Sequence, residues 1–391
     1  MTHNQRTEAG GLLSDIVPNA LEEHDIDTVR AAHRATGAKI LIIGGYGQVG
    51  RMIAERLAPL FPGRVAVAGR SGTKARTAAT EIGHGATGRT IDVLGRGKDQ
   101  DLGDVALVLV CIDQIDTGFA RRCLERGIRY LDISADYAFL SQVESLDDVA
   151  RKSGATALLS VGLAPGLTNL LAARAKQKMT RVERIDILLE FGLGDRHGQA
   201  AVEWLFDNLD AEYQVREDGQ MRPVRSFGEH LGIRHPGQTK GRAAYRFNFS
   251  DQHVIWRTLD VPSASTWVRF ESRIVTWAFA ISAKAGLGRL LRRARWRRVA
   301  VWLFQNIRIG TNMCAVAVRA TGQTTDGPGS ITVGVMGHDE ALMTAVIAAE
   351  IARQALVSDL PLGVLHSEQA VDLDPVLKAL QAEIPDITLS L

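Results

Sequence analysis

The chain has 391 residues, of which 46% are hydrophobic and 23% charged, and its formal net charge is only +2. These values are typical of an ordinary soluble protein with a sizeable core, arranged as two domains or one large one. The small net charge excludes any general argument for binding nucleic acid or an acidic membrane, so an electrostatic partner must be argued from local clusters.

Cysteine usage and the N-terminus indicate a cytoplasmic protein. The three cysteines show no CxxC pattern and no metal-ligand spacing with the ten histidines. We therefore expect a reducing compartment, no structural disulfide and no metal. The first residues, "MTHNQRTEAGGLLSD", lack the apolar core of a signal peptide, and no apolar stretch is long enough for a membrane span.

The first half of the chain alternates between apolar runs and helical segments, after a polar extension over residues 1–36. The runs show no polar alternation, as in "VALVLVCI", which is typical of parallel strands covered on both faces. They predict a doubly wound, Rossmann-type α/β domain over residues 37–165. The predicted strands are 40–44, 65–69, 90–93, 105–112, 130–134 and 157–161.

The pattern of apolar residues changes from about residue 182. Alternating runs such as "RIDILLEF" and "MCAVAVRA" favour an antiparallel sheet with one covered face. Residues 166–337 are therefore predicted to form an inserted second α+β domain on a mostly antiparallel sheet. From residue 338 the chain returns to helix with "DEALMTAVIAAEIARQAL". We expect this segment, 338–391, to pack back on the first domain.

A glycine motif directly follows the first predicted strand. Gly45, Gly47 and Gly50 form G-x-G-x-x-G at the start of a helical pattern, with Tyr46, Gln48 and Val49 between them. Such glycines permit a tight turn, close approach of a pyrophosphate and close packing of helix on strand, while the helix N-terminus faces the anion. We interpret the segment as a dinucleotide site.

The end of the second strand indicates which dinucleotide is bound. An NAD site usually offers a carboxylate there for the ribose 2′-hydroxyl. This chain has Arg70, Ser71 and Lys74 instead. A guanidinium and hydroxyl suit a 2′-phosphate, which a carboxylate would repel, so NADP(H) is the predicted cofactor.

Later strand ends add further candidates, because strand ends open onto the cofactor crevice. Asp92 and Val93 stand at the end of the third predicted strand, and Cys111 and Ile112 at the end of the fourth. We interpret Cys111 as a small neighbour of the cofactor rather than a nucleophile.

Two more stretches, "YLDIS" (130–134) and "GLAPG" (162–166), make the pattern specific. Together with "GGYGQVG" and the arginine after the second strand, they resemble the saccharopine dehydrogenase-like family, NADP-dependent reductases related to saccharopine reductase and carboxynorspermidine dehydrogenase. The resemblance implies that Asp132, Ser134, Pro165 and Gly166 lie at the nicotinamide end, and that the second domain mediates a homodimer. Saccharopine-forming members usually carry an aspartate where this chain has Ala164, so the lysine-pathway substrate is not carried over.

The resemblance implies hydride transfer, most often to a C–N bond, on a small amine or amino-acid-derived substrate. Candidate proton donors or positioning residues are Asp132, Asp136 and Tyr137 in the first domain, and Arg196, His197 and Glu203 in "GLGDRHGQAAVEW". Histidine has the pKa closest to neutrality, so His197 suits proton transfer, while Arg196 suits a substrate carboxylate. Each also has an ordinary structural interpretation, such as a solvated loop residue.

Other reaction classes are less consistent with the sequence. No tyrosine starts the Y-x-x-x-K pattern of short-chain dehydrogenases, and neither Cys123 nor Cys314 looks activated for covalent catalysis. Reduction of a carbonyl or activated alkene stays open. So does a non-catalytic NADP-binding sensor or a membrane- or carrier-associated protein.

Residues 286–304, "GLGRLLRRARWRRVAVWLF", contain six arginines within ten positions beside leucines and tryptophans. The pattern predicts a basic amphipathic helix, which suits anionic lipid, an acidic carrier protein or a lid over an acidic substrate. A solvated surface helix of the second domain or a dimer contact is the simpler interpretation, because charge runs on helices are usually exposed faces. Nucleic acid is not expected as a partner.

Overall fold

The computed structural model describes residues 37–95, 102–194, 199–236, 241–291, 293–306 and 309–391. Its first domain contains a seven-stranded sheet in which every pairing is parallel, in the order β15-β6-β5-β4-β1-β2-β3. The strands are β1 (Lys39–Ile43), β2 (Val65–Gly69), β3 (Thr87–Thr90), β4 (Val105–Val110), β5 (Arg129–Asp132), β6 (Thr156–Leu159) and β15 (Gly363–His366).

Helices cover both faces of this sheet, and each face has its own cluster of buried apolar side chains. The helices of this domain are α2 (Gln48–Leu60), α3 (Gly72–Ile82), α4 (Gly118–Glu125), α5 (Tyr137–Glu144), α6 (Asp147–Lys152), α13 (Glu340–Val357) and α14 (Leu373–Glu383). The helix α7 (Leu167–Gln177) packs instead on β13, β14 and β7 of the second sheet. Burial on both faces explains the uninterrupted apolar runs, and the predicted Rossmann-type sheet is confirmed. The third strand was misplaced: β3 ends at Thr90 because its neighbour β2 ends at the paired Gly69, so Asp92 and Val93 follow the strand.

The second domain contains another seven-stranded sheet, in the order β10-β11-β12-β7-β13-β14-β16. All its pairings are antiparallel except β12 with β7, which confirms the predicted mostly antiparallel sheet. Its strands are β7 (Arg181–Leu193), β10 (His230–Ile233), β11 (Arg242–Arg246), β12 (Ser263–Phe270), β13 (Ile309–Thr324), β14 (Gly327–His338) and β16 (Thr388–Ser390), and β8 (Glu212–Glu217) and β9 (Gln220–Arg225) form a separate hairpin.

The two faces of the second sheet are buried in different ways. One face carries apolar side chains such as Ile187, Leu189 and Val316, which belong to the main core. On the other face the alternate residue Glu190 is buried and accepts hydrogen bonds from Arg242 (2.8 Å) and Arg269 (2.8 Å). Buried charges are stable here because they are paired.

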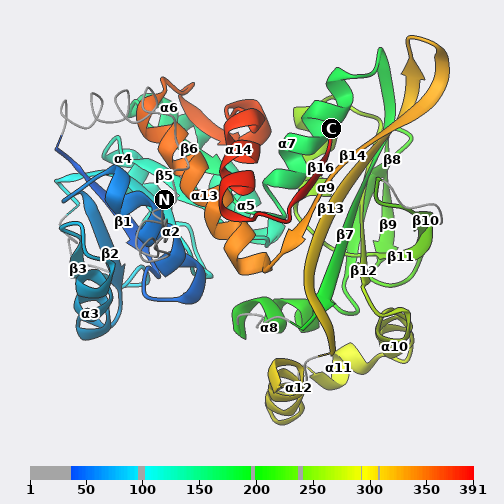
Figure 1. Cartoon of the computed structure of the whole chain (residues 1–391), viewed down its shortest axis with the longest axis horizontal. Helices are drawn as coiled ribbons and strands as arrows, with labels where there is room; N and C mark the ends of the chain where they lie inside the picture. The colour runs from blue at the N-terminus through cyan, green and yellow to red at the C-terminus, as the bar shows by residue number, and fades with distance from the viewer. Residues whose placement is uncertain (1–36, 96–101, 195–198, 237–240, 292, 307–308) are drawn as a thin grey trace, which may run out of the picture.

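Five helices belong to the second domain: α8 (Gln199–Asp207), α9 (Asp251–Thr258), α10 (Arg273–Lys284), α11 (Leu287–Leu291) and α12 (Ala294–Asn306). Figure 1 shows α8, α10, α11 and α12 together at the lower end of this domain. The continuous helix predicted over 286–304 was wrong, because the chain forms a turn in which the Arg293 N–H donates to the Leu290 carbonyl at 3.1 Å. In the described part of the chain, no helix has the length and apolarity to cross a membrane.

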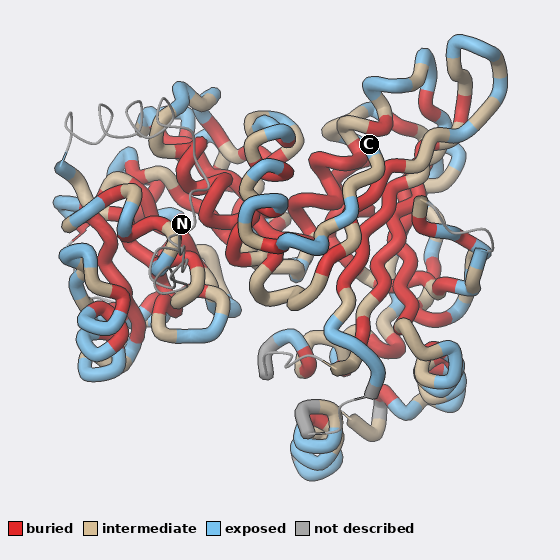
Figure 2. Tube along the Cα trace, viewed as in Figure 1, coloured by how far each residue is buried: buried red, intermediate tan, exposed pale blue. Residues whose placement is uncertain are grey.

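The C-terminal segment joins both domains. β15 is the edge strand of the first sheet, α13 packs on α2, and β16 pairs with β14 of the second sheet. His366, at the end of β15, is buried between the Ser160 hydroxyl (2.8 Å) and the Glu144 carboxylate (2.9 Å). Figure 2 shows that the buried chain runs through both sheets, whereas the outer surfaces of α10 and α12 are exposed.

Candidate functional site

The turn between β1 and α2 has the geometry that a pyrophosphate requires. The Gly47 N–H donates to the Gly44 carbonyl at 2.8 Å, and α2 begins at the next residue. A Cβ at Gly50 would lie 2.5 Å from the Gly44 carbonyl oxygen, and one at Gly45 would lie 2.9 Å from that of Ile42. Only glycine allows this close packing, and it leaves the first N–H groups of α2 available to an anion.

Residues after β2 provide positive charge without a carboxylate. Arg70 and Lys74 are exposed, and the Ser71 hydroxyl caps α3 by accepting the Lys74 backbone N–H at 3.4 Å. The first turn of α3 contains no acidic residue. The Tyr46 hydroxyl accepts the Ser71 backbone N–H at 3.4 Å, which ties the glycine turn to this segment. The arrangement fits a ribose 2′-phosphate.

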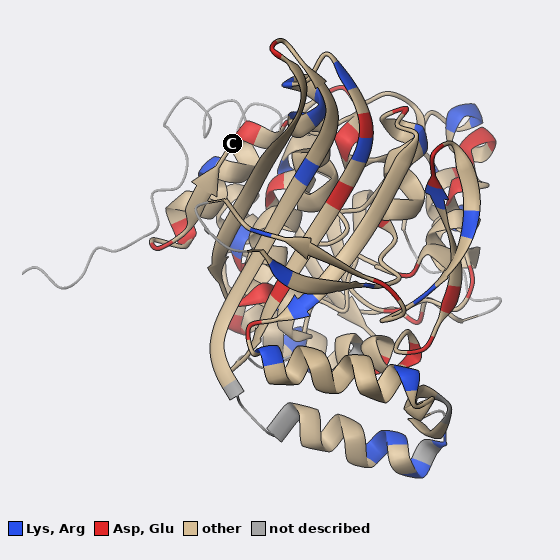
Figure 3. Cartoon of the chain, turned by 90° about the vertical axis from the view of Figure 1, so that its right-hand side faces the viewer, with Lys and Arg blue, Asp and Glu red and all other residues tan. Residues whose placement is uncertain are grey.

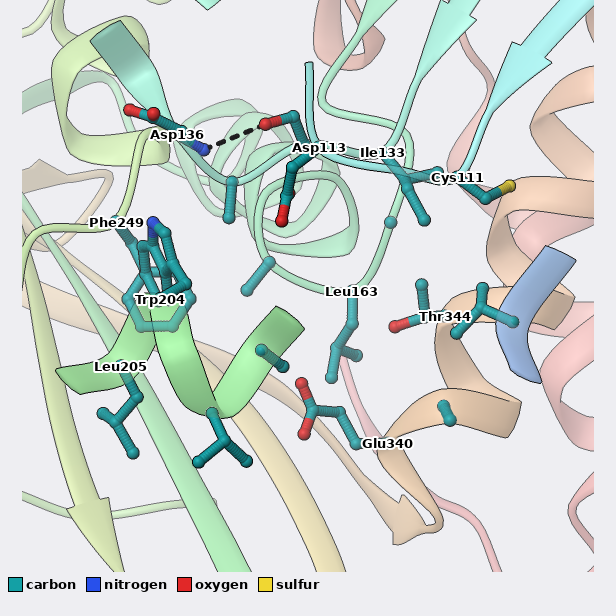
Figure 4. A pocket seen from close by; sticks show the side chains of 18 of the residues that line it. Cys111, Asp113, Ile133, Asp136, Leu163, Trp204, Leu205, Phe249, Glu340 and Thr344 are labelled. Carbon is teal, nitrogen blue, oxygen red and sulfur yellow. Dashed lines mark hydrogen bonds between the residues drawn. The ribbon is translucent and has the colours of Figure 1, made fainter. Parts of the chain in front are cut away.

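A cavity of about 390 Å³ is lined by residues of both domains (Figure 4), and the glycine turn forms part of its wall. Seven predicted cofactor residues line it: Gly47, Gln48, Val49, Gly50, Cys111, Ile112 and Ser134. Burial and the nearby Asp132 carboxylate raise the pKa of the Cys111 thiol, so it stays protonated. This agrees with the interpretation of Cys111 as a small neighbour rather than a nucleophile.

The opposite wall comes from the second domain and is apolar and largely aromatic. Its residues are Phe191, Ala201, Val202, Trp204, Leu205, Phe247, Phe249, Val268, Phe270 and Phe304. The Trp204 ring packs edge-on against Phe249 and Phe247, with centroid distances of 4.9 and 5.5 Å. Sequence reasoning missed most of this wall, because its residues come from two strands, one loop and two helices that no local pattern connects.

Three carboxylates also line the cavity: Asp113 after β4, Asp136 before α5 and Glu340 at the start of α13. Figure 4 shows that Asp113 and Glu340 point into the cavity from different elements. Among the described lining residues there is no lysine, arginine or histidine. Burial, followed by the negative charges of Asp136 and Glu203, raises the pKa of Asp113. The cavity therefore favours a cationic group or supplies a proton.

Asp132 lies behind the cavity wall rather than in it. Its carboxylate is fully buried and accepts hydrogen bonds from the Tyr130 hydroxyl (2.5 Å), Gln114 Nε2 (2.8 Å) and the Ser134 N–H (2.8 Å). Burial raises its pKa to about 7. Asp132 is not among the lining residues, and its carboxylate holds the Ser134 backbone by accepting that N–H. Its predicted catalytic role stays a prediction.

Of the three catalytic residues predicted in the second domain, the structure describes Glu203 alone. Glu203 does not line the cavity, and its carboxylate lies 3.6 Å from Arg297 of α12. Arg196 and His197 lie outside the described residues, so their roles stay predictions.

The "GLAPG" segment contributes to the cavity through its first residues. Gly162, Leu163 and Ala164 line it, whereas Pro165 and Gly166 are not among its lining residues. The Gly162 N–H donates to the Pro165 carbonyl at 2.9 Å, and a Cβ at Gly166 would lie 2.0 Å from the Gly162 carbonyl oxygen. This tight loop places Leu163 and Ala164 in the wall, and contact of Pro165 and Gly166 with a cofactor stays a prediction.

Asp92 and Val93 do not line the cavity either. The Asp92 carboxylate is exposed and accepts the Leu94 backbone N–H at 3.2 Å, while Val93 is buried in the core of the first domain. Both follow the end of β3, and neither reaches the glycine turn's cavity. Contact of Asp92 with a cofactor stays a prediction.

Comparisons with known proteins agree with the geometry of the first domain. Residues 40–158 match the family model for the saccharopine dehydrogenase NADP-binding domain. Carboxyaminopropylagmatine dehydrogenase of Synechocystis sp. is 27% identical over 222 residues, which are 51% of this chain and 54% of that protein. The match thus spans about half the length of this relative.

Among solved structures, saccharopine dehydrogenase (L-Glu forming) from Saccharomyces cerevisiae superimposes with a TM-score of 0.61. The match covers 91% of this chain and 100% of that one at 14% identity, so it shows a shared fold. The predicted NADP cofactor and the resemblance to saccharopine dehydrogenase-like proteins are confirmed. Residues 40–158 form a saccharopine dehydrogenase-type NADP-binding domain.

Proposed function

We propose that the protein is an NADP(H)-dependent oxidoreductase that transfers hydride to or from a C–N bond of a small amine with an apolar body. One observation carries this proposal. The carboxylates of Asp113, Asp136 and Glu340 share a cavity with an aromatic wall, and that cavity begins at the dinucleotide turn. Carboxylates and aromatic faces both attract a positively charged nitrogen.

The cofactor supplies or accepts the hydride when it is bound along the α2 N-terminus. The chain's own residues then have to orient the substrate and protonate it. The raised pKa of Asp113 lets its carboxyl group retain a proton at higher pH than an ordinary aspartate does, so it can protonate an imine nitrogen. Hydride addition to the adjacent carbon then gives the amine, and the C=N π electrons become the nitrogen lone pair.

Glu340 supports the cationic nitrogen from another side of the cavity, and the Trp204 wall excludes water from the reacting atoms. The relative from Synechocystis sp. is named for a substrate that is itself an amine, which is consistent with this chemistry. The match covers about half of each chain, so the amine named for this relative enters here only as support for the proposal.

The test is NADPH oxidation with a panel of imines, amine–aldehyde pairs, carbonyls and activated alkenes matched in apolar size. We expect turnover with C=N substrates, a lower KM for those with a protonated nitrogen, and a raised KM in Glu340→Gln. Glu340→Asp serves as the control that keeps the charge. Turnover only with carbonyls or alkenes contradicts the C–N assignment, and tight NADPH binding without turnover on the whole panel favours the sensor.

A further inference from the structure

Helices α10 and α12 expose large apolar side chains along one face each. On α10 the residues are Ile274 (78% exposed), Trp277 (61%) and Ile281 (43%). On α12 they are Trp296, Val299, Trp302 and Leu303, with Trp302 61% exposed. The spacing of three, four or seven positions places each set on one side of its helix. We call these two faces together the α10/α12 surface.

The core does not use this surface. α10 packs on its domain through Thr276, Ala280 and Ala283, and α12 through Val301. Phe279 of α10 contacts Phe304 of α12 edge-on, with ring centroids 6.2 Å apart, and this contact holds the two helices together. Both helices are therefore fixed by their inner sides, and the tryptophans on their outer sides face solvent.

Positive charge surrounds the apolar residues. The segment 272–308 contains nine lysines and arginines and no aspartate or glutamate, although the whole chain has a net charge of only +2. The exposed cations on these helices and the turn between them are Arg273, Lys284, Arg293, Arg295 and Arg298. Figure 3 shows basic positions at both ends of α10 and toward one end of α12, with uncharged stretches between.

This combination identifies one kind of partner. Tryptophan and aliphatic side chains enter the boundary between lipid headgroups and acyl chains, while arginine and lysine pair with anionic headgroups. A second copy of the chain would bring the same cations against this surface, so like-charge repulsion disfavours a symmetric dimer through it. An acidic protein would satisfy the cations but would not require a row of exposed tryptophan and isoleucine.

We propose that the α10/α12 surface docks the protein on an anionic lipid membrane without spanning it. The surface lies one helix away from the cavity, because Phe304 of α12 lines the cavity wall from the inner side of the same helix. Docking there places the apolar wall close to the lipid. This inference rests on the exposed face alone and does not depend on the proposed reaction.

Flotation of the full-length protein with lipid vesicles tests the proposal. We expect binding to vesicles of equimolar phosphatidylcholine and phosphatidylglycerol, weak binding to phosphatidylcholine alone, and release at high salt. Arg295→Gln and Arg298→Gln should each weaken binding about fivefold, since a cation near an anionic surface contributes about 1 kcal/mol. Trp277→Ser and Trp302→Ser should each weaken it roughly tenfold by removing buried apolar area.

Matched controls lie on other surfaces. Met221→Ser removes an exposed apolar side chain from β9, and Arg181→Gln removes an exposed charge from β7; both should bind vesicles like the parent. NADPH affinity, unchanged in every variant, shows that the variants fold. Absence of anionic-vesicle binding by the parent, or unchanged binding by all four α10/α12 variants, overturns the proposal. So does a dimer that dissociates in Trp302→Ser without any vesicle binding.

Discussion

The two walls of the cavity differ in composition. The first-domain wall combines glycine backbone and the carboxylates of Asp113 and Asp136 with aliphatic side chains such as Ile112 and Leu163, whereas the second-domain wall is wholly aromatic and aliphatic. The glycine turn depends on backbone approach, which tolerates almost no side-chain change. The aromatic wall depends on shape and apolar area, which tolerate substitution with a graded loss. Cofactor binding and substrate selection should therefore respond separately to mutation.

Gly50→Ala should have the largest effect, and it should fall on the cofactor alone. Its Cβ would lie 2.5 Å from the Gly44 carbonyl oxygen, so the turn must shift. We expect at least about 100-fold weaker NADPH binding, on the order of 3 kcal/mol for an overpacked site. Fluorescence titration of NADPH measures it. Gly232→Ala is the control, since its Cβ has no neighbour within 4 Å; parent-like affinity in Gly50→Ala would contradict the proposed turn.

Asp113→Asn should affect the pH profile more than cofactor affinity. The raised pKa keeps the carboxyl group protonated to higher pH, so the reduction rate of the parent should fall as pH rises through this pKa. At low pH the kcat of the asparagine variant should be about 100-fold below that of the parent, and its rate should not decline as pH rises through this pKa.

Asp136→Asn sharpens the same experiment. It removes one of the negative charges that raise the pKa of Asp113. The decline of the rate with rising pH should therefore begin at lower pH, while the reaction persists. Asparagine can still cap α5, which Asp136 does by accepting the Ala138 N–H at 2.9 Å. If the rate declines at the same pH in the parent and in both variants, a group other than Asp113 supplies the proton.

Arg70→Ala should weaken NADPH binding roughly 10- to 100-fold, about 1.5 to 3 kcal/mol for a lost charge-assisted hydrogen bond. NADH lacks the 2′-phosphate, so its affinity should change little and serves as the internal control. Parallel titration of both cofactors measures the preference. A parent that binds NADH as tightly as NADPH would refute the role of Arg70.

Trp204→Ala should have the smallest effect and should act from the other wall. Loss of its contacts with Phe247 and Phe249 should raise the KM of apolar amines about tenfold, because apolar contact area is lost, and leave NADPH affinity unchanged. Trp204→Phe keeps most of the surface and should restore most of the KM. An equal loss in cofactor affinity would mean that the two walls are not independent.

Much of the first wall could be predicted from local sequence. The residues from Gly44 to Gly50 form one turn between consecutive elements, and the turn needs glycine whatever surrounds it. Arg70 likewise follows directly from the end of a buried strand. The prediction was less accurate where a residue's role depends on packing: Asp132 is close in sequence to Ser134, yet its carboxylate points away from the cavity into a buried cluster.

The sequence by itself determined the parallel sheet, the mostly antiparallel second sheet, the dinucleotide turn and its preference for NADP, because hydrophobic periodicity and glycine spacing act over a few neighbouring residues. Only the tertiary structure decided which side chains share the cavity with the dinucleotide turn. Phe191, Trp204, Phe249 and Glu340 meet there although they are far apart in the chain. Their proximity depends on how the two sheets and the returning α13 pack together, and local patterns contain no information about such long-range contacts.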